Sequence, residues 1–308
     1  MNAGRPVGQH VAVIIISYNT KVLLDKCLTA LKPELCDGDE VVVLDNASSD
    51  GSADLVVVAH PWVSLIRSPT NLGFGAGCNE AVRRTTADWI LLLNPDTVVF
   101  PGTIVGLLDF AERRPDGGLY GGRTVGSDRQ LDPRSCWAAP SVWSIFCSAV
   151  GLTAAFRRSW LFDPESMGSW QRDDERHVDI VTGCLLLVSR QWWDRLDGFA
   201  EKYFMYGEDA DLNMRARKLG ARPMITPEVT IQHLVGASST RPDKLVYVLR
   251  GKLTYVYDHF DFVQARMAMA LMFFGVFLRG LVWPTLFRRT NSWTTVWNRR
   301  REWLERYR

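Results

Sequence analysis

The sequence predicts an α/β protein whose mainly parallel sheet is covered by helices on both faces. Four strand-like runs, at 11–19, 40–45, 63–68 and 88–96, are rich in apolar residues and alternate with helical segments. Strands that are apolar on both sides lie buried between helix layers, which is typical of parallel sheets. The chain has 308 residues, of which 47% are hydrophobic and 23% charged, so it can bury a large core.

Each element of the first third follows from its local pattern. The β-branched run "VAVIIISYN" predicts the first strand, and "KVLLDKCLTALKP" predicts a helix that closes at Pro33. The second strand breaks into "DNASSDGS", which is turn and N-cap chemistry. A third strand leads into "NLGFGAG", a glycine-rich turn that opens a helix, and "DWILLLNPD" completes the series. Between about 117 and 180 the pattern weakens, and we expect loops, a short strand and a surface helix there.

Polar side chains stand where these buried strands end. Asn19, Asp45 and Asp96 follow three of the strands, and ligands of parallel sheets bind at that edge. Asp96 can hold a divalent cation together with substrate phosphates, and Asp45 can accept a hydrogen bond from a nucleobase imide. The alternative for both aspartates is that they cap the helices that follow.

The glycines of "GFGAG" do not predict a dinucleotide site. That fingerprint requires GxGxxG directly after the first strand, where this chain has "SYNTK". The glycines are instead expected to let the backbone approach a phosphate or a neighbouring strand closely.

A third cluster lies in "FMYGEDADLNMRARKLG". Glu208, Asp209 and Asp211 crowd the start of a helix, where the macrodipole favours negative charge, so plain capping is one reading. The other reading is a general base, since crowded, partly buried acids have raised pKa values. His233 ends the apolar strand "VTIQH" and becomes a metal ligand only with a partner.

Taken together, these motifs resemble the inverting family 2 glycosyltransferases of GT-A fold, and most closely their rhamnosyltransferase-like branch. The resemblance covers about residues 11–240. It implies a catalytic domain over 1–240, with a nucleotide-binding half at 1–116 and an acceptor-binding half at 117–240. Residues 241–308 would form a helical membrane-associating segment.

The resemblance also assigns roles to residues. Those expected to bind the nucleotide-sugar are Ser17, Tyr18, Asn19, Asp45, Asn46, Asn71, Gly73, Phe74, Asn79, Asn94 and Asp96. Asp96 and His233 would hold Mg²⁺ or Mn²⁺, although Asn-Pro-Asp replaces the family's Asp-x-Asp and leaves one carboxylate fewer. Asp209 would be the base, with Glu208 and Asp211 as its neighbours. Thr182, Gly183, Trp192 and Trp193 would form the acceptor wall, and core packing is the alternative for both tryptophans.

The C-terminal segment combines an apolar stretch with basic residues. Residues 267–278 are uncharged but bracketed by Arg266 and Arg279, and eight arginines lie between 279 and 308. Twelve helical residues span about 18 Å, short of a bilayer, so we expect a helix lying in the interface of an anionic membrane. A true span, or a helix pair packed on the catalytic domain or on a second subunit of a homodimer, are the alternatives.

The six cysteines show no CxxC pair, and residues at the N-terminus lack signal-peptide features, so we expect reduced thiols and a cytoplasmic protein on the inner membrane face. We expect no nucleic-acid partner. The predicted function is metal-dependent transfer of a sugar, L-rhamnose from dTDP-rhamnose, onto a cell-envelope glycan or polyprenyl-linked saccharide. A UDP-sugar or another galactofuranosyl, mannosyl or glucosyl donor is the alternative within the class. A catalytically silent nucleotide-sugar-binding scaffold is the alternative outside it.

Overall fold

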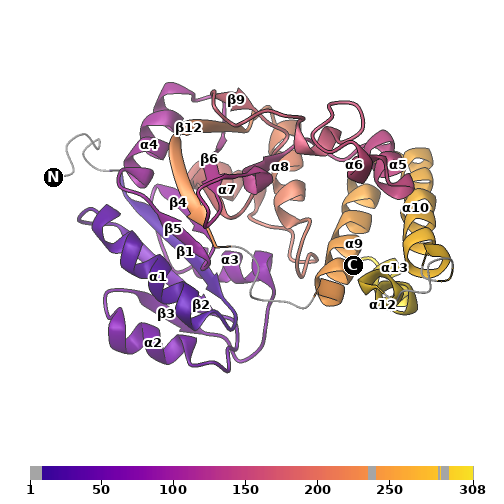
Figure 1. The fold of residues 1–308 in the computed structure, drawn as a ribbon. Coiled ribbons are helices and arrows are strands. Elements are labelled where there is room, and N and C mark those ends of the chain that lie inside the picture. The colour runs from indigo at the N-terminus through magenta and orange to yellow at the C-terminus, as the bar shows by residue number, and fades with distance from the viewer. Residues whose placement is uncertain (1–8, 235–240, 284, 286–290, 308) are drawn as a thin grey trace.

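A ten-stranded sheet forms the centre of the molecule in the computed structural model, which describes residues 9–234, 241–283, 285 and 291–307 (Figure 1). The strand order is β3-β2-β1-β4-β11-β6-β12-β5, with β7 beside β6 and β9 beside β12. The strands are β1 (Val11–Ser17), β2 (Glu40–Asp45), β3 (Ser64–Arg67), β4 (Trp89–Leu93), β5 (Thr97–Val99), β6 (Leu119–Val125), β7 (Leu131–Asp132), β9 (Arg176–His177), β11 (Leu185–Ser189) and β12 (Met224–His233). A second, two-stranded sheet pairs β8 (Cys136–Trp137) with β10 (Ile180–Val181).

The sheet is parallel in its first half and mixed beyond β4. β1 pairs in parallel with β2 and β4, and β2 pairs in parallel with β3. β11 lies antiparallel between β4 and β6, whereas β6 and β12 are parallel. The mainly parallel α/β architecture predicted from the sequence is therefore confirmed.

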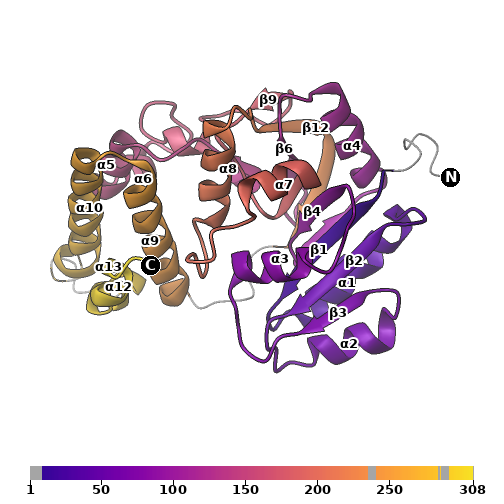
Figure 2. The same ribbon diagram turned by 180° about the vertical axis from the view of Figure 1, so that it is seen from behind.

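Helices cover both faces of this sheet (Figures 1 and 2). Successive residues of β1 point alternately into two cores: Val11, Val13 and Ile15 pack on one face with α1 and α4, and Ala12, Ile14 and Ile16 pack on the other with α3, α7 and α8. The helices are α1 (Lys21–Leu31), α2 (Ser52–Ala59), α3 (Phe74–Val82), α4 (Thr103–Arg113), α7 (Arg190–Leu196) and α8 (Glu208–Lys218).

A helical end stands beside the sheet, on the side of α8 (Figure 2). Its members are α5 (Val142–Val150), α6 (Leu152–Ala155), α9 (Arg241–His259), α10 (Phe262–Phe277), α12 (Ser292–Asn298) and α13 (Arg300–Leu304). Two side-chain contacts link α9 to α8 and to the loop before α8. His259 Nε2 lies 2.9 Å from Asp211 Oδ1, and the Tyr203 hydroxyl donates to Asp258 at 2.7 Å. α9 thus packs on the sheet-containing part of the chain.

The apolar helix α10 continues through a π-helical turn to Val282. The resulting helix, Phe262–Val282, has 21 residues with a mean hydropathy of 1.6 and is long and apolar enough to cross a membrane. One third of its apolar window is nevertheless buried in the protein. α5 packs directly on this helix, because a Cβ added to Gly275 would lie 2.8 Å from the Cα atom of Ala149.

Candidate active site

The predicted metal pair comes together because of strand pairing. His233 ends β12 in register with Thr97 at the start of β5, which places it beside Asp96. Its Nε2 lies 3.3 Å from Asp96 Oδ1, and the backbone N–H of Leu234 donates to the Asp96 carbonyl at 2.8 Å. Helix α4 begins only after Gly102, so Asp96 is not its cap.

A residue that the sequence did not reveal completes this group. Asp132, at the end of β7, places Oδ2 at 3.2 Å from His233 Nδ1, while its Oδ1 accepts a bond from Arg134 Nε at 2.6 Å. Burial would lower the pKa of His233, but the hydrogen bonds to Asp132 and Asp96 outweigh burial and raise it to about 9. Asp132 lies in the segment without periodic pattern, so no sequence signal pointed to it.

A divalent cation at Asp96 and His233 would displace the proton that the two aspartates stabilise on the imidazole, and substrate phosphates would supply its further ligands. The Asp132 carboxylate fixes the tautomer and orientation of the imidazole so that Nε2 faces Asp96, which is the usual outer-shell arrangement of a metal-binding histidine. Among the described residues, no group of three or more His, Cys, Asp or Glu side chains could hold a metal ion by itself. Two protein ligands are what Mg²⁺ and similar hard cations use when phosphates supply the rest.

Asp45 occupies the same edge of the sheet, at the end of β2. Its side chain is 4% exposed; Oδ2 accepts the backbone N–H of Ser48, and Oδ1 has no hydrogen-bond partner. Helix α2 begins after Gly51, so Asp45 does not cap it. A buried carboxylate oxygen without a partner is costly, and a ligand N–H would satisfy it.

The neighbouring polar residues shape the loops around Asp45. Asn19 accepts the backbone N–H of Ser49 at 2.8 Å, and Asn46 donates to the carbonyl of Gly73 at 2.9 Å. Ser17 bonds Thr20, Tyr18 is exposed, and Asn71 accepts the N–H of Gly73. Gly73 is the N-cap of α3 and has φ +84°. The N–H of the next residue, Phe74, donates to the carbonyl of Phe204.

Asn79 does not face this edge. Its amide donates to the carbonyl of Phe199 at 2.8 Å and accepts the N–H of the same residue at 2.9 Å. The prediction that Asn79 contacts the nucleotide is corrected accordingly, because the protein's own backbone uses both ends of the amide.

The predicted base reaches the same rim from the other half of the chain. Asp209 lies in the first turn of α8, and the backbone N–H groups of Ala210 and Gly183 bind its carboxylate, while burial raises its pKa above the usual range. Gly183 precedes β11, where the carbonyl of Cys184 accepts the N–H of Asn94. Burial and the charges of Asp132, Asp96 and Asp209 raise the pKa of the Cys184 thiol to about 12. Asp209 therefore lies beside the Gly183–Cys184 segment, which is hydrogen-bonded to the end of β4 through Asn94.

The two acidic neighbours of Asp209 differ from each other. Glu208 is buried, its Oε2 has no partner, and burial with the Asp209 charge raises its pKa to about 8. Asp211 binds His259 and Arg215, and Arg215 in turn donates to the carbonyls of Leu196 and Gly198. Asp211, predicted as a neighbour of the base, therefore joins α8 to α9.

The acceptor wall is corrected in part. β11 runs antiparallel to β4, so α7 begins at the opposite rim, where the N–H of Arg190 donates to the Asp88 carbonyl. Trp193 is 5% exposed and packs edge-on against Phe199, and Trp192 packs partly on the same core. The acceptor-wall prediction for both tryptophans is wrong. Thr182 and Gly183 do lie at the rim, where Thr182 Oγ1 donates to the carbonyls of Arg134 and Ser135.

Comparison with known proteins identifies the family of this chain. Residues 12–173 match the model of the family "Glycosyl transferase family 2". The chain belongs to glycosyl transferase family 2. This family 2 enzyme is 28% identical over 263 residues, 80% of its length and 82% of the relative's, to an N-acetylglucosaminyl-diphospho-decaprenol L-rhamnosyltransferase of Mycobacterium tuberculosis.

Solved structures show the GT-A fold for this family 2 glycosyltransferase. A mannosyltransferase from Pyrobaculum calidifontis, in complex with GDP-Man and Mn²⁺, superposes with a TM-score of 0.57 at 16% identity, over 96% of this chain and 84% of that one. S. aureus TarS 1–349 in complex with UDP-GlcNAc superposes with a TM-score of 0.54 at 16% identity, over 94% and 78%.

Proposed function

We propose that this family 2 glycosyltransferase moves L-rhamnose from dTDP-rhamnose onto a cell-envelope glycan or polyprenyl-linked saccharide, with inversion at the anomeric carbon. The observation that carries the proposal is the position of Asp209 at the same rim as Asp96 and His233. The rhamnosyl donor and the lipid-linked acceptor are supported by the printed activity of the mycobacterial relative.

In this mechanism Asp209 removes the proton from the acceptor hydroxyl as that oxygen attacks the sugar. The N–H groups of Gly183 and Ala210 hold the carboxylate in place, and burial raises its pKa, which makes it a stronger base than an exposed aspartate. A single displacement inverts the anomeric centre. Residues 117–240 supply the acceptor side of this reaction.

Residues 1–116 supply the nucleotide side. The unpartnered Asp45 Oδ1 would accept the imide N–H of thymine or uracil. Asp96 and His233 would hold Mg²⁺ or Mn²⁺, and such a cation, when bound, neutralises charge on the departing diphosphate. The Asp132 carboxylate keeps the imidazole of His233 oriented for this task.

A thermal-shift screen of dTDP-, UDP- and GDP-sugars, each with Mg²⁺ or Mn²⁺, tests the donor assignment, because ligand binding adds stability directly. We expect the largest shift with dTDP-rhamnose and a divalent cation. A larger shift with a galactofuranosyl, mannosyl or glucosyl nucleotide would reassign the donor. Binding without any sugar transfer to lipid-linked acceptors would favour the silent scaffold.

A further inference from the structure

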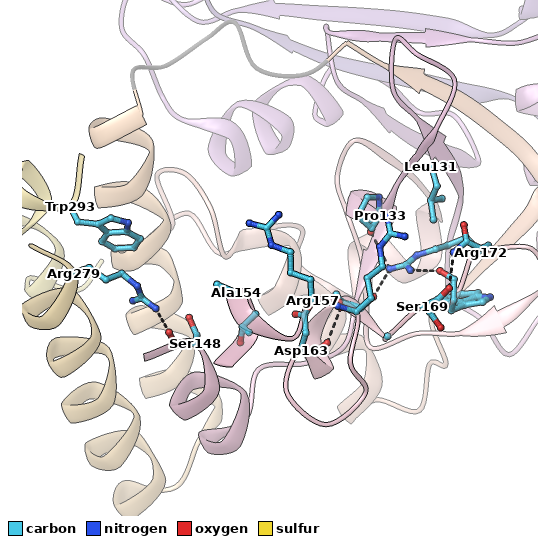
Figure 3. A pocket seen from close by; sticks show the side chains of 16 residues that line it. Leu131, Pro133, Ser148, Ala154, Arg157, Asp163, Ser169, Arg172, Arg279 and Trp293 are labelled. Carbon is cyan, nitrogen blue, oxygen red and sulfur yellow. Dashed lines mark hydrogen bonds between the residues drawn. The ribbon is translucent and has the colours of Figure 1, made fainter. Parts of the chain in front are cut away.

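A cavity of about 540 Å³ opens beside the candidate active site, between the sheet and the helical end (Figure 3). Three parts of the chain line it: the turn at 131–133, the segment 148–172, and the C-terminal residues Arg279 and Trp293. Its volume is that of a pocket for a small ligand. The cavity is distinct from the rim that holds Asp45.

Arginine side chains dominate the charge of this cavity. Arg157 and Arg158 are exposed, and within the described residues neither guanidinium forms an ion pair. Arg279 is half-buried; it donates to the carbonyl of Ser148 and lies 5.0 Å from the ring of Trp293, and burial lowers its pKa. Asp163 is the one acid among the described lining residues.

A fourth guanidinium indicates that the cavity is built for a ligand. Arg172 is 1% exposed and donates to the carbonyls of Trp170, Ser166 and Pro133, while its Nε has no partner. A buried cation without a carboxylate beside it is unfavourable unless an anion or further acceptors complete its hydrogen bonds. The cavity is lined by four arginines and one aspartate, so its net positive charge suits a ligand with several negative charges.

The two ends of the cavity have different chemistry. At one end, Leu131 and Pro133 flank Asp132, which bonds His233 in the active site. At the other end lie α5, α6 and the π-helical turn that extends α10 to Val282 (Figure 1). Large apolar side chains are exposed on α5, on the segment that follows α6, and on α10. These are Trp143 on α5, Phe156, Trp160 and Leu161 after α6, and Phe262, Val263, Met267, Phe273 and Phe274 on α10.

We propose that this cavity binds the diphosphate of a polyprenyl-diphosphate-linked acceptor. The saccharide would then point towards Asp209 and the hydrocarbon chain would lie along the apolar helices. A guanidinium group binds phosphate through two parallel hydrogen bonds. The several negative charges of a diphosphate match four arginines better than the single negative charge of a phospholipid head group does. The inference rests on the proposed function, because it places that function's lipid-linked acceptor.

Binding of farnesyl diphosphate to the full-length protein in detergent tests this site. Farnesyl monophosphate, inorganic pyrophosphate and phosphatidylglycerol nanodiscs serve as comparison ligands, and titration calorimetry gives each affinity. The variant Arg157→Gln/Arg158→Gln removes two charges from exposed residues. Arg83→Gln/Arg84→Gln is the matched control, since it removes an adjacent exposed arginine pair from the far end of α3.

We expect wild-type protein to bind farnesyl diphosphate more tightly than the other three ligands. The Arg157/Arg158 variant should bind farnesyl diphosphate about tenfold or more weakly than wild type. The control variant should bind it with wild-type affinity, and both variants should bind dTDP-sugars like wild type. Equal farnesyl diphosphate affinity in variant and wild type would overturn the site, as would a loss confined to phosphatidylglycerol. If the proposed function itself is wrong, wild type, the Arg157/Arg158 variant and the control variant will all fail to bind nucleotide-sugars.

Discussion

Glu208 is a carboxylic acid buried beside the candidate base, and its raised pKa ties stability to pH. The folded-state pKa is about 8 against an ordinary value of 4.5, so between these values the folded protein holds a proton that the unfolded chain releases. The free energy of unfolding therefore falls as the pH rises from about 4.5 to 8, because the unfolded chain releases this proton and the folded protein keeps it. We expect Glu208→Gln to raise the free energy of unfolding at pH 8.5 by on the order of 3 kcal/mol.

Urea unfolding at pH 5 and pH 8.5 measures this difference. The variant should gain at pH 8.5 and change little at pH 5, and Glu112→Gln, at an exposed position, should change little at either. An equal effect of Glu208→Gln at both pH values would mean that the carboxyl group is not neutral in the folded protein.

Asp132 positions His233 and offers a test of the metal pair. Removing an outer-shell carboxylate typically lowers metal affinity about 10- to 100-fold. Asp132→Asn should therefore weaken Mn²⁺-dependent nucleotide binding by that factor and leave metal-free binding unchanged. Asp128→Asn, in the exposed turn before β7, is the control, and calorimetry with and without Mn²⁺ is the measurement. An Asp132→Asn protein with wild-type metal dependence would separate His233 from the metal.

Site residues at the ends of long apolar strands could be predicted from the sequence, whereas site residues in segments without a periodic pattern could not. Asp45, Asp96 and His233 are recognisable because each ends a strand, and strand ends gather at one rim. Asp132 ends a two-residue strand that leaves no periodic signal. Trp192 and Trp193 were misplaced because their position depends on the antiparallel direction of β11, which an apolar run does not reveal.

At the level of elements, the turn into α3 depends on close backbone contact. A Cβ at Gly73 would lie 2.0 Å from the carbonyl oxygen of Phe204, and the residue has φ +84°. We expect Gly73→Ala to lower the free energy of unfolding by about 2 kcal/mol or more and to weaken nucleotide binding, because the loop must move.

Gly102 provides a matched control for that variant. It has φ +86°, but an added Cβ would meet no atom within 4 Å. Gly102→Ala should therefore show the backbone strain alone, about 1 kcal/mol, with unchanged nucleotide binding. Equal losses for the two variants, measured by urea unfolding, would show that the contact with Phe204 contributes nothing.

Strand β6 shows why the segment 117–180 gave a weak signal. It lies between β11 and β12, in the middle of the sheet, yet it reads "LYGGRTV". An added Cβ would lie 2.5 Å from Val181 at Gly121 and 2.6 Å from the Val229 carbonyl at Gly122. Close packing against neighbours distant in sequence therefore selects glycine, and this removes the apolar alternation that predicts a strand.

At the scale of the whole molecule, the helical end is part of the folded unit and also carries an exposed apolar surface. Tyr307 donates to the Met205 carbonyl and its N–H binds Thr254, so the C-terminus packs back on the loop before α8. The sequence predicted an apolar and basic segment, but it did not predict that α5 would join α10, since that contact links residues more than 100 positions apart. Removing the whole segment would expose core residues, so surface substitutions are the better test.

Phe262 and Val263 are 74% and 64% exposed at the start of α10. If this surface lies in a membrane interface, Phe262→Ser/Val263→Ser should lower co-flotation with phosphatidylglycerol vesicles severalfold, because less apolar area enters the interface. Val57→Ser/Val58→Ser on α2, with 56% and 82% exposure, is the matched control and should float like wild type. Unchanged flotation of the Phe262/Val263 variant would place the membrane contact elsewhere.

The account as a whole depends on Asp209 acting as the base at the rim that binds the donor. The most direct measurement is the rate of sugar transfer from dTDP-rhamnose to a polyprenyl-linked saccharide by Asp209→Asn, beside its affinity for the donor. We expect turnover to fall by about 10² to 10⁴ with donor affinity nearly unchanged, and Asp194→Asn on α7 to match wild type. Transfer by Asp209→Asn at the wild-type rate would contradict the account.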